Sequence, residues 1–160
     1  MAKRYRELLD KTKEEIGKAI IGQDEIVNGL LRAILANGHV LIEGVPGIAK
    51  TLVIRTLAAT TKCSFSRIQF TVDLLPSDIT GITTYHQKNE QFSVIKGPIF
   101  NNYIIADEIN RSPPKTQSAL LEAMQEKQAT IGKQPFKIRE PFFVMANNNP
   151  IESSGVHPRP

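Results

Sequence analysis

The sequence predicts an α/β fold built around a parallel sheet, because short apolar strands alternate with helical patterns along the chain. Three nearly continuous apolar runs, at 39–42, 103–106 and 142–146, have the pattern of strands that are covered on both faces. Between these runs, apolar residues recur at the helical spacing of three and four positions. We find no internal repeat and no linker-like segment, which favours a single domain.

The composition is that of a globular chain without special stabilisation. The 160 residues have a mass of 17.8 kDa, and 41% of them are hydrophobic and 22% charged. These ordinary values exclude collagen, low-complexity disorder and membrane classes. The single Cys63 and three scattered histidines offer no metal-ligand spacing. The N-terminus lacks the apolar stretch of a signal peptide, and no run approaches the roughly 18 apolar residues of a membrane span, so we expect a cytoplasmic protein.

The positive charge of the chain is mild and dispersed. The formal net charge is +4, from 20 Lys and Arg against 16 Asp and Glu. Over residues 3–18 the basic residues alternate with acidic ones, which indicates a solvated helix face. We therefore do not expect nucleic acid as a partner, since the sequence has no stripe of basic residues interleaved with aromatics.

The first 37 residues are expected to form two helices. Apolar residues recur loosely at helical spacing over 5–20, and a broad apolar stripe follows over 26–35. Asn37 and Gly38 end the second helix, because both residues tolerate the left-handed conformation of a helix terminus.

The rest of the chain, 38–150, alternates strands and helices, and 151–160 form a loose tail rich in Ser, Gly and Pro. Ser112 is expected to cap the last helix, with Pro113 in its first turn. In chain order we expect a strand at 39–42, a helix through 52–58, a strand at 65–70, an irregular segment around Pro76, a hairpin of 83–85 with 91–95, a strand at 103–106, a helix that turns Ala119, Leu120, Ala123 and Met124 inward, a hairpin of 128–131 with 136–138, and a strand at 142–146.

The strongest local motif lies between the first strand and the helix that follows it. It has the composition and setting of a phosphate-binding loop, formed by Gly44, Val45, Pro46, Gly47, Ile48, Ala49, Lys50 and Thr51. Backbone N–H groups of such a loop surround a β-phosphate, aided by the positive end of the following helix. Lys50 would reach the β- and γ-phosphates, and the Thr51 hydroxyl would coordinate Mg²⁺. Ala49 stands where the usual pattern has glycine, and the alternative is a glycine-rich turn with an incidental lysine.

An acidic pair, Asp107 and Glu108, directly follows the apolar run 103–106. Ligands bind at the carboxyl ends of strands in α/β folds, so this position suits a site. Asp107 would lie in the Mg²⁺ shell, and Glu108 would polarise an attacking water as general base. The alternative is a solvated turn.

An asparagine run, 147–149, follows the last apolar strand. A carboxamide here could donate a hydrogen bond to a γ-phosphate or hold the lytic water. Taken alone, the run indicates only a turn.

These motifs together resemble a MoxR-type AAA+ ATPase. The resemblance extends from about Ile20 to the end of the chain. It rests on matching segments at 38–47, 49–51, 67–71, 73–78, 97–98, 106–111, 113–115, 117, 119–124, 141–146 and 149–152.

The resemblance implies a P-loop NTPase core, a three-layer αβα sandwich with a parallel sheet and two inserted β-hairpins. Members bind ATP with Mg²⁺ and hydrolyse it between the subunits of a ring, usually a hexamer. They act as chaperone-like remodellers of proteins, often beside partners with a von Willebrand A domain.

The resemblance also assigns roles to residues. The loop 44–51, with Leu52 after it, matches the Walker A motif, and Asp107 with Glu108 matches Walker B. Asn149 matches the sensor-1 asparagine, so Lys50, Glu108 and Asn149 are the catalytic candidates. Thr51 and Asp107 are the expected metal ligands, and the segment with Ile21 and Gly22 lies where members hold adenine.

One departure from the resemblance concerns the C-terminal side. Relatives continue into a Leu-Asp-Arg-Phe segment with a further strand and then a helical lid domain with its own arginine, and this sequence matches neither part. An arginine supplied in trans is worth about 10³–10⁵ in rate, so we expect this chain to bind nucleotide better than it turns it over. Neither Arg111 nor Arg159 is assigned that role. The strand 40–42 is expected near a sheet edge.

Two other functions stay open at this point. One is a nucleic-acid motor core of the MCM type, which the mild positive charge permits. The other is a nucleotide-binding scaffold that does not hydrolyse.

Overall fold

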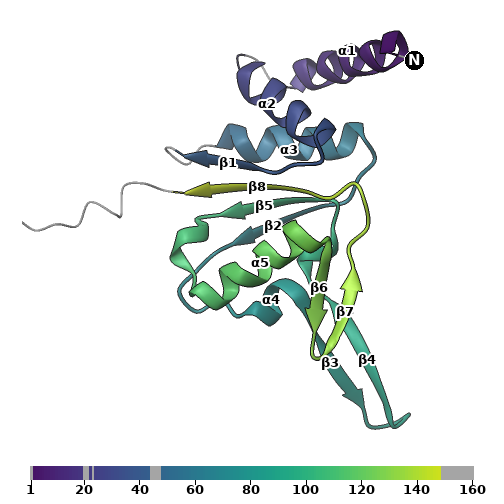
Figure 1. Ribbon diagram of the computed structural model, residues 1–160, viewed down its shortest axis with the longest axis vertical. Helices are drawn as coiled ribbons and strands as arrows, with labels where there is room; N and C mark the ends of the chain where they lie inside the picture. The colour runs from purple at the N-terminus through teal and green to yellow at the C-terminus, as the bar shows by residue number, and fades with distance from the viewer. Residues whose placement is uncertain (1, 20–21, 23, 44–47, 149–160) are drawn as a thin grey trace, which may run out of the picture.

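The computed structural model describes residues 2–19, 22, 24–43 and 48–148. Within them a four-stranded sheet is flanked by helices, and two hairpins extend from it (Figure 1). In chain order the elements are α1 (Ala2–Ala19), α2 (Asp24–Leu35), β1 (Val40–Glu43), α3 (Ile48–Thr60), β2 (Phe65–Gln69), α4 (Pro76–Thr80), β3 (Gly81–His86), β4 (Gln91–Lys96), the 3₁₀ turn η1 (Pro98–Phe100), β5 (Tyr103–Asp107), the 3₁₀ turn η2 (Ile109–Arg111), α5 (Pro114–Glu126), β6 (Gln128–Ile131), β7 (Gln134–Lys137) and β8 (Phe143–Asn148).

The central sheet has the strand order β1-β8-β5-β2, and every pair is parallel. Parallel strands end at the same edge, so the carboxyl ends of β5 and β8 lie side by side. The predicted parallel α/β sheet is confirmed. Among the described residues, strand β1 is one of the two edge strands of this sheet, as expected, and Leu41 is 56% exposed there.

Alternating side chains of the central strands divide the core into two clusters, one on each face of the sheet. Tyr103 and Ile105 of β5 pack with α1, α2 and α3, whereas Ile104 and Ala106 pack with α4, α5 and β6. Figure 1 shows α1–α3 on one side of the sheet and α4 and α5 on the other. The three-layer αβα arrangement is therefore confirmed.

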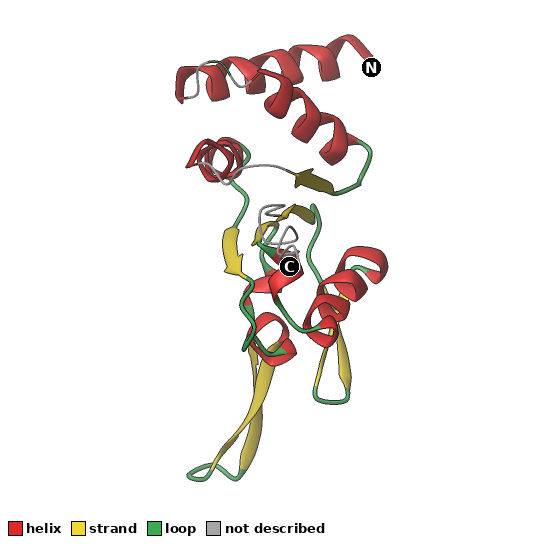
Figure 2. Ribbon diagram, turned by 90° about the vertical axis from the view of Figure 1, so that its left-hand side faces the viewer, coloured by secondary structure: helices red, strands yellow, loops and turns green. Residues whose placement is uncertain are grey.

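Both predicted hairpins are present, β3 with β4 and β6 with β7. They point away from the sheet in the same direction (Figure 2). At the root of the longer hairpin, Gly81 has a φ of 109°, and a Cβ atom there would lie 2.1 Å from the Ile95 carbonyl oxygen. Only glycine fits this close approach of two backbones.

Three local expectations were wrong or incomplete. Ser112 does not cap α5, because the turn η2 ends at this residue and its hydroxyl donates to the Ile109 carbonyl at 3.3 Å. Pro113 takes the N-cap position, and the helix begins at Pro114. The segment around Pro76 is a helical turn, and β8 continues two residues past Ala146, to Asn148. The predicted tail 151–160 lies outside the described residues.

No helix among the described residues is both long enough and apolar enough to cross a membrane.

His39, just before β1, forms hydrogen bonds with β8 and with the end of α5. Its Nδ1 accepts a hydrogen bond from the Val144 N–H at 3.0 Å, so the proton belongs on Nε2, which lies 3.2 Å from the Met124 carbonyl oxygen. The ring packs against Phe142 and Phe143. Burial lowers the pKa of His39 below its usual 6.5, and the nearby Lys127 ammonium lowers it further. The structure therefore holds this imidazole in the neutral form.

We predict that His39 makes the fold less stable as the solution is acidified below about pH 6.5. Its pKa is lower in the folded state, so the unfolded chain takes up a proton first and gains free energy relative to the folded chain. The stabilisation is complete above pH 6.5 and is lost as the pH falls toward the folded-state pKa. Urea unfolding at pH 7.5 and 5.5 measures this loss. It should be smaller in His39→Asn than in the parent, whereas His86→Asn on the exposed hairpin is the control. Equal pH dependence in the parent and His39→Asn would contradict the assignment.

Candidate functional site

The carboxyl ends of β5 and β8 bring the acidic pair and the asparagine run together. The Asn147 Nδ2 donates a hydrogen bond to Asp107 Oδ1 at 2.6 Å. The backbone N–H of Glu108 donates to Asn147 Oδ1 at 2.7 Å. Asn147 is only 7% exposed. One buried carboxamide thus joins the two strand ends and satisfies both of its functional groups.

Asp107 is a buried carboxylate with a donor on each oxygen. Its residue is 6% exposed, and its Oδ2 accepts a hydrogen bond from Arg67 Nε at 2.5 Å. Arg67 reaches it from β2, where Gln69 stands opposite Asp107 in the strand register. A carboxylate buried this far needs such charge compensation, because burial of an unpaired charge is costly.

Glu108 leaves the sheet in a left-handed conformation, with φ 56° and ψ 46°. This conformation costs a non-glycine residue roughly 1–2 kcal/mol, and here the Asn147 bond to its N–H helps to hold it. Its Oε2 accepts from Gln69 Nε2 at 2.8 Å and lies 3.2 Å from Arg111 Nε. The carboxylate is therefore held by two side chains of its own chain.

Sequence reasoning placed Asp107 and Glu108 correctly at the sheet edge but did not assign a role to Arg67 or Gln69. These residues alternate on β2, so they share one face of a strand that ends beside Asp107. Two polar residues at alternate positions of a strand are the signal that could have found them. Of the asparagine run, Asn147 is engaged inside the protein, and Asn149 lies outside the described residues.

The predicted phosphate-binding loop has the expected setting. Strand β1 ends at Glu43 and helix α3 begins at Ile48, so the loop joins a strand to a helix at the carboxyl edge of the sheet. Residues 44–47 themselves lie outside the described residues. The backbone of Ala49 and Lys50 is in the first turn of α3, where N–H groups lack helical partners and favour an anion. Next in the helix, Thr51 is partly buried and Leu52 is 43% exposed.

Gly22 belongs to a hollow at the start of α2. The hollow has a volume of about 370 Å³ and is lined by Gly22, Asp24, Glu25 and Ile26. Gly22 has a φ of 78°, the left-handed region that favours glycine. Ile21, the other residue predicted to contact adenine, is outside the described residues.

The donor set fits a magnesium ion that takes most of its ligands from phosphates and water. Among the described residues, no group of three or more His, Cys, Asp and Glu could hold an ion by itself. The protein oxygens predicted to face a metal are the Asp107 carboxylate and the Thr51 hydroxyl. Mg²⁺ prefers hard oxygen ligands, usually one or two carboxylates together with substrate phosphates.

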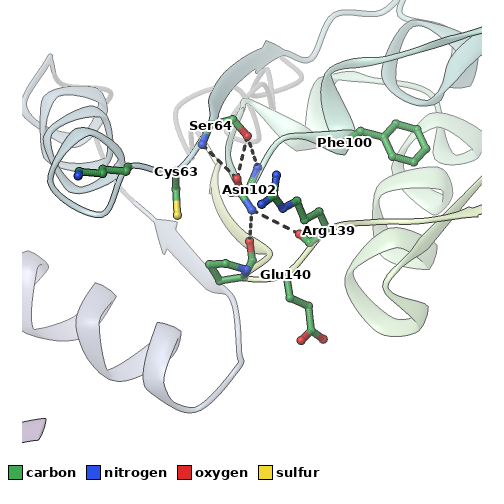
Figure 3. A pocket seen from close by; sticks show the side chains of 8 residues that line it. Cys63, Ser64, Phe100, Asn102, Arg139 and Glu140 are labelled. Carbon is green, nitrogen blue, oxygen red and sulfur yellow. Dashed lines mark hydrogen bonds between the residues drawn. The ribbon is translucent and has the colours of Figure 1, made fainter.

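A second cavity lies at the opposite edge of the sheet, where β2, β5 and β8 begin (Figure 3). It has a volume of about 340 Å³, and the buried Asn102 stands at its centre. The Asn102 Oδ1 accepts from the Ser64 N–H and hydroxyl, and its Nδ2 donates to the Pro141 carbonyl at 2.9 Å. All its polar atoms are thus occupied in joining three segments, so its role is structural.

Comparison with known proteins agrees with this geometry. Residues 39–160 match the family described as "ATPase family associated with various cellular activities (AAA)". The chain is 51% identical over 152 residues to Chaperone MoxR1 of Mycobacterium tuberculosis. This match covers 95% of this chain and 40% of that protein. It is 50% identical over 153 residues to the uncharacterised protein YeaC of Bacillus subtilis, covering 96% of this chain and 48% of YeaC.

A crystal structure of a candidate ATPase from Cytophaga hutchinsonii superposes with a TM-score of 0.85 at 52% identity. The match covers 98% of this chain and 48% of that one. The chain therefore spans about half the length, or less, of these relatives.

We predict that Asn102→Ala destabilises the fold by about 1–3 kcal/mol, because its hydrogen-bond partners before the starts of β2 and β8 lose their bonds. Urea unfolding gives the free energy. The control is Asn101→Ala, since the Asn101 side chain donates a local hydrogen bond to the nearby Pro98 carbonyl. Equal losses in the two variants would show that Asn102 does not join the segments.

Proposed function

We propose, from the premise that this chain belongs to the AAA family of ATPases and is of the MoxR type, that it binds and hydrolyses Mg²⁺-ATP at the carboxyl edge of its sheet. The observation that carries the proposal is the cluster of Asp107, Glu108 and Asn147. It lies at the ends of β8, which is the neighbour of β1, and of β5, which is the next strand along the sheet, and β1 leads into the predicted phosphate-binding loop. Few other functions require a Gly-rich loop after one strand and two acids after another strand at the same edge of a parallel sheet.

The roles follow from the chemistry of each group. The loop 44–51 and the start of α3 bind the phosphates through backbone N–H groups, with Lys50 on the β- and γ-phosphates. Thr51 and Asp107 hold Mg²⁺, which neutralises charge on the phosphates when bound. Glu108 accepts the proton of the attacking water, and Asn149 orients that water or the γ-phosphate.

The hollow at the start of α2 supports the assignment of residues that would contact adenine. Ile21 and Gly22 precede α2, whose first residues line the hollow described above. We propose that they contact the adenine ring, with Leu52 following the phosphate loop on α3.

We further propose that the chain works in a homo-oligomeric ring, a hexamer in its full-length form, that remodels protein partners in the cytoplasm. This rests on the chaperone named among its relatives and on the ring assembly expected of the type. A partner with a von Willebrand A domain is part of the same proposal. Subunit contacts would complete each nucleotide site.

The test is titration of a fluorescent ATP analogue in the presence of Mg²⁺. The parent chain should bind, and Lys50→Ala should lose binding, because the charge that meets the phosphates is gone. Glu108→Gln should keep binding and lose single-turnover hydrolysis, since an amide cannot accept the proton. Lys62→Ala, two residues after the end of α3, is the control. Binding by Lys50→Ala as tight as the parent's would refute the phosphate-loop assignment.

A further inference from the structure

The Arg67 guanidinium contacts the oxygen of Asp107 that would otherwise be open to a metal ion. Asp107 Oδ1 is taken by the Asn147 amide, and Oδ2 is taken by Arg67 Nε. Asn147 is neutral and comes from the adjoining strand β8. Among the side chains that the structure describes, Arg67 is therefore the cation that compensates this buried charge.

The two members of the pair differ in their freedom. Asp107 is buried at the end of a central strand, between β2 and β8. The Arg67 side chain is 54% exposed on β2, which is the other edge strand of the sheet. The guanidinium can therefore leave without opening the core, whereas the carboxylate stays in place.

A guanidinium and a divalent cation that contact the same carboxylate oxygen repel each other strongly, because both are positive and only a few ångströms apart. We propose that Arg67 is a positioning residue: an internal counterion that holds Asp107 when no metal is bound and must withdraw before Asp107 can take part in metal binding. This inference rests on the proposed function. Under this inference, binding of the metal–nucleotide complex displaces the Arg67 guanidinium from the Asp107 carboxylate.

A contact between Arg67 and Gln69 connects the counterion of Asp107 to the second acid, Glu108. Arg67 Nη2 donates a hydrogen bond to Gln69 Oε1 at 3.4 Å, and Gln69 Nε2 donates to Glu108. Arg67 thus borders the side chain that holds the second acid. Its withdrawal leaves Gln69 as the remaining β2 contact of the acidic pair.

The first experiment measures how much Mg²⁺ is needed for half-maximal binding of a fluorescent ATP analogue. Arg67→Met keeps the apolar stem and removes the charge, so this concentration should fall about two- to fivefold, as expected for a half-exposed charge pair. Arg67→Lys keeps a cation and should stay near the parent. Binding of the analogue in EDTA should not change. The control Arg139→Met removes an exposed arginine at the opposite edge of the sheet.

The second experiment needs neither metal nor nucleotide. Arg67→Met should lower the thermal midpoint of the parent by several degrees but not that of Asp107→Asn, since the neutral amide needs no counterion. An unchanged or higher Mg²⁺ requirement in an Arg67→Met chain that binds nucleotide would overturn the inference, as would equal thermal shifts in both backgrounds. A parent that binds no nucleotide at any Mg²⁺ concentration contradicts the proposed function instead, and the thermal cycle then decides whether Arg67 is the counterion of Asp107.

Discussion

The two hydrogen bonds of the Asn147 side chain are the constraint on which the candidate site depends. One bond fixes the carboxylate of Asp107, and the other holds the backbone N–H of Glu108 as the chain turns into a left-handed conformation. Because Asn147 is buried at the end of β8, both acids are tied to a strand in the centre of the sheet. The site is thereby built on rigid elements of the fold.

The alternation of side chains along parallel strands explains why these groups meet. Ile105 and Met145 pack into the cluster that contains α3, and Asp107 and Asn147 follow them by two residues on the same face. The polar ends of β5 and β8 therefore lie on the side of the sheet that α3 covers. The helix start that would bind phosphate and the acids that would act on it share one face.

Much of this arrangement was predictable from the sequence. Continuous apolar strands and the helical periods between them predict the sheet. Ligands of α/β folds bind at the carboxyl ends of the strands, and this rule predicts a site at the two acids after 103–106. Arg67 and Gln69 were not assigned a role, because a strand register decides which acid each one meets. Ser112 was misassigned as a cap because it ends the turn after Glu108, where its hydroxyl donates to the Ile109 carbonyl. The local sequence pattern does not reveal this turn. Lys50 and Asn149 keep their roles as predictions.

The most direct test of the central claim is hydrogen exchange at the backbone amide of Glu108, followed by NMR in the nucleotide-free chain. The account predicts slow exchange in the parent, because this N–H donates to a buried oxygen. Asn147→Ala should make it exchange fast, while the amide of Ile104 stays protected. Asn148→Ala is the matched control, since its side-chain oxygen has no hydrogen-bond partner within the part of the chain that the structure describes. Equal exchange at Glu108 in the parent and in Asn147→Ala would contradict the claim that Asn147 holds the acidic pair in place.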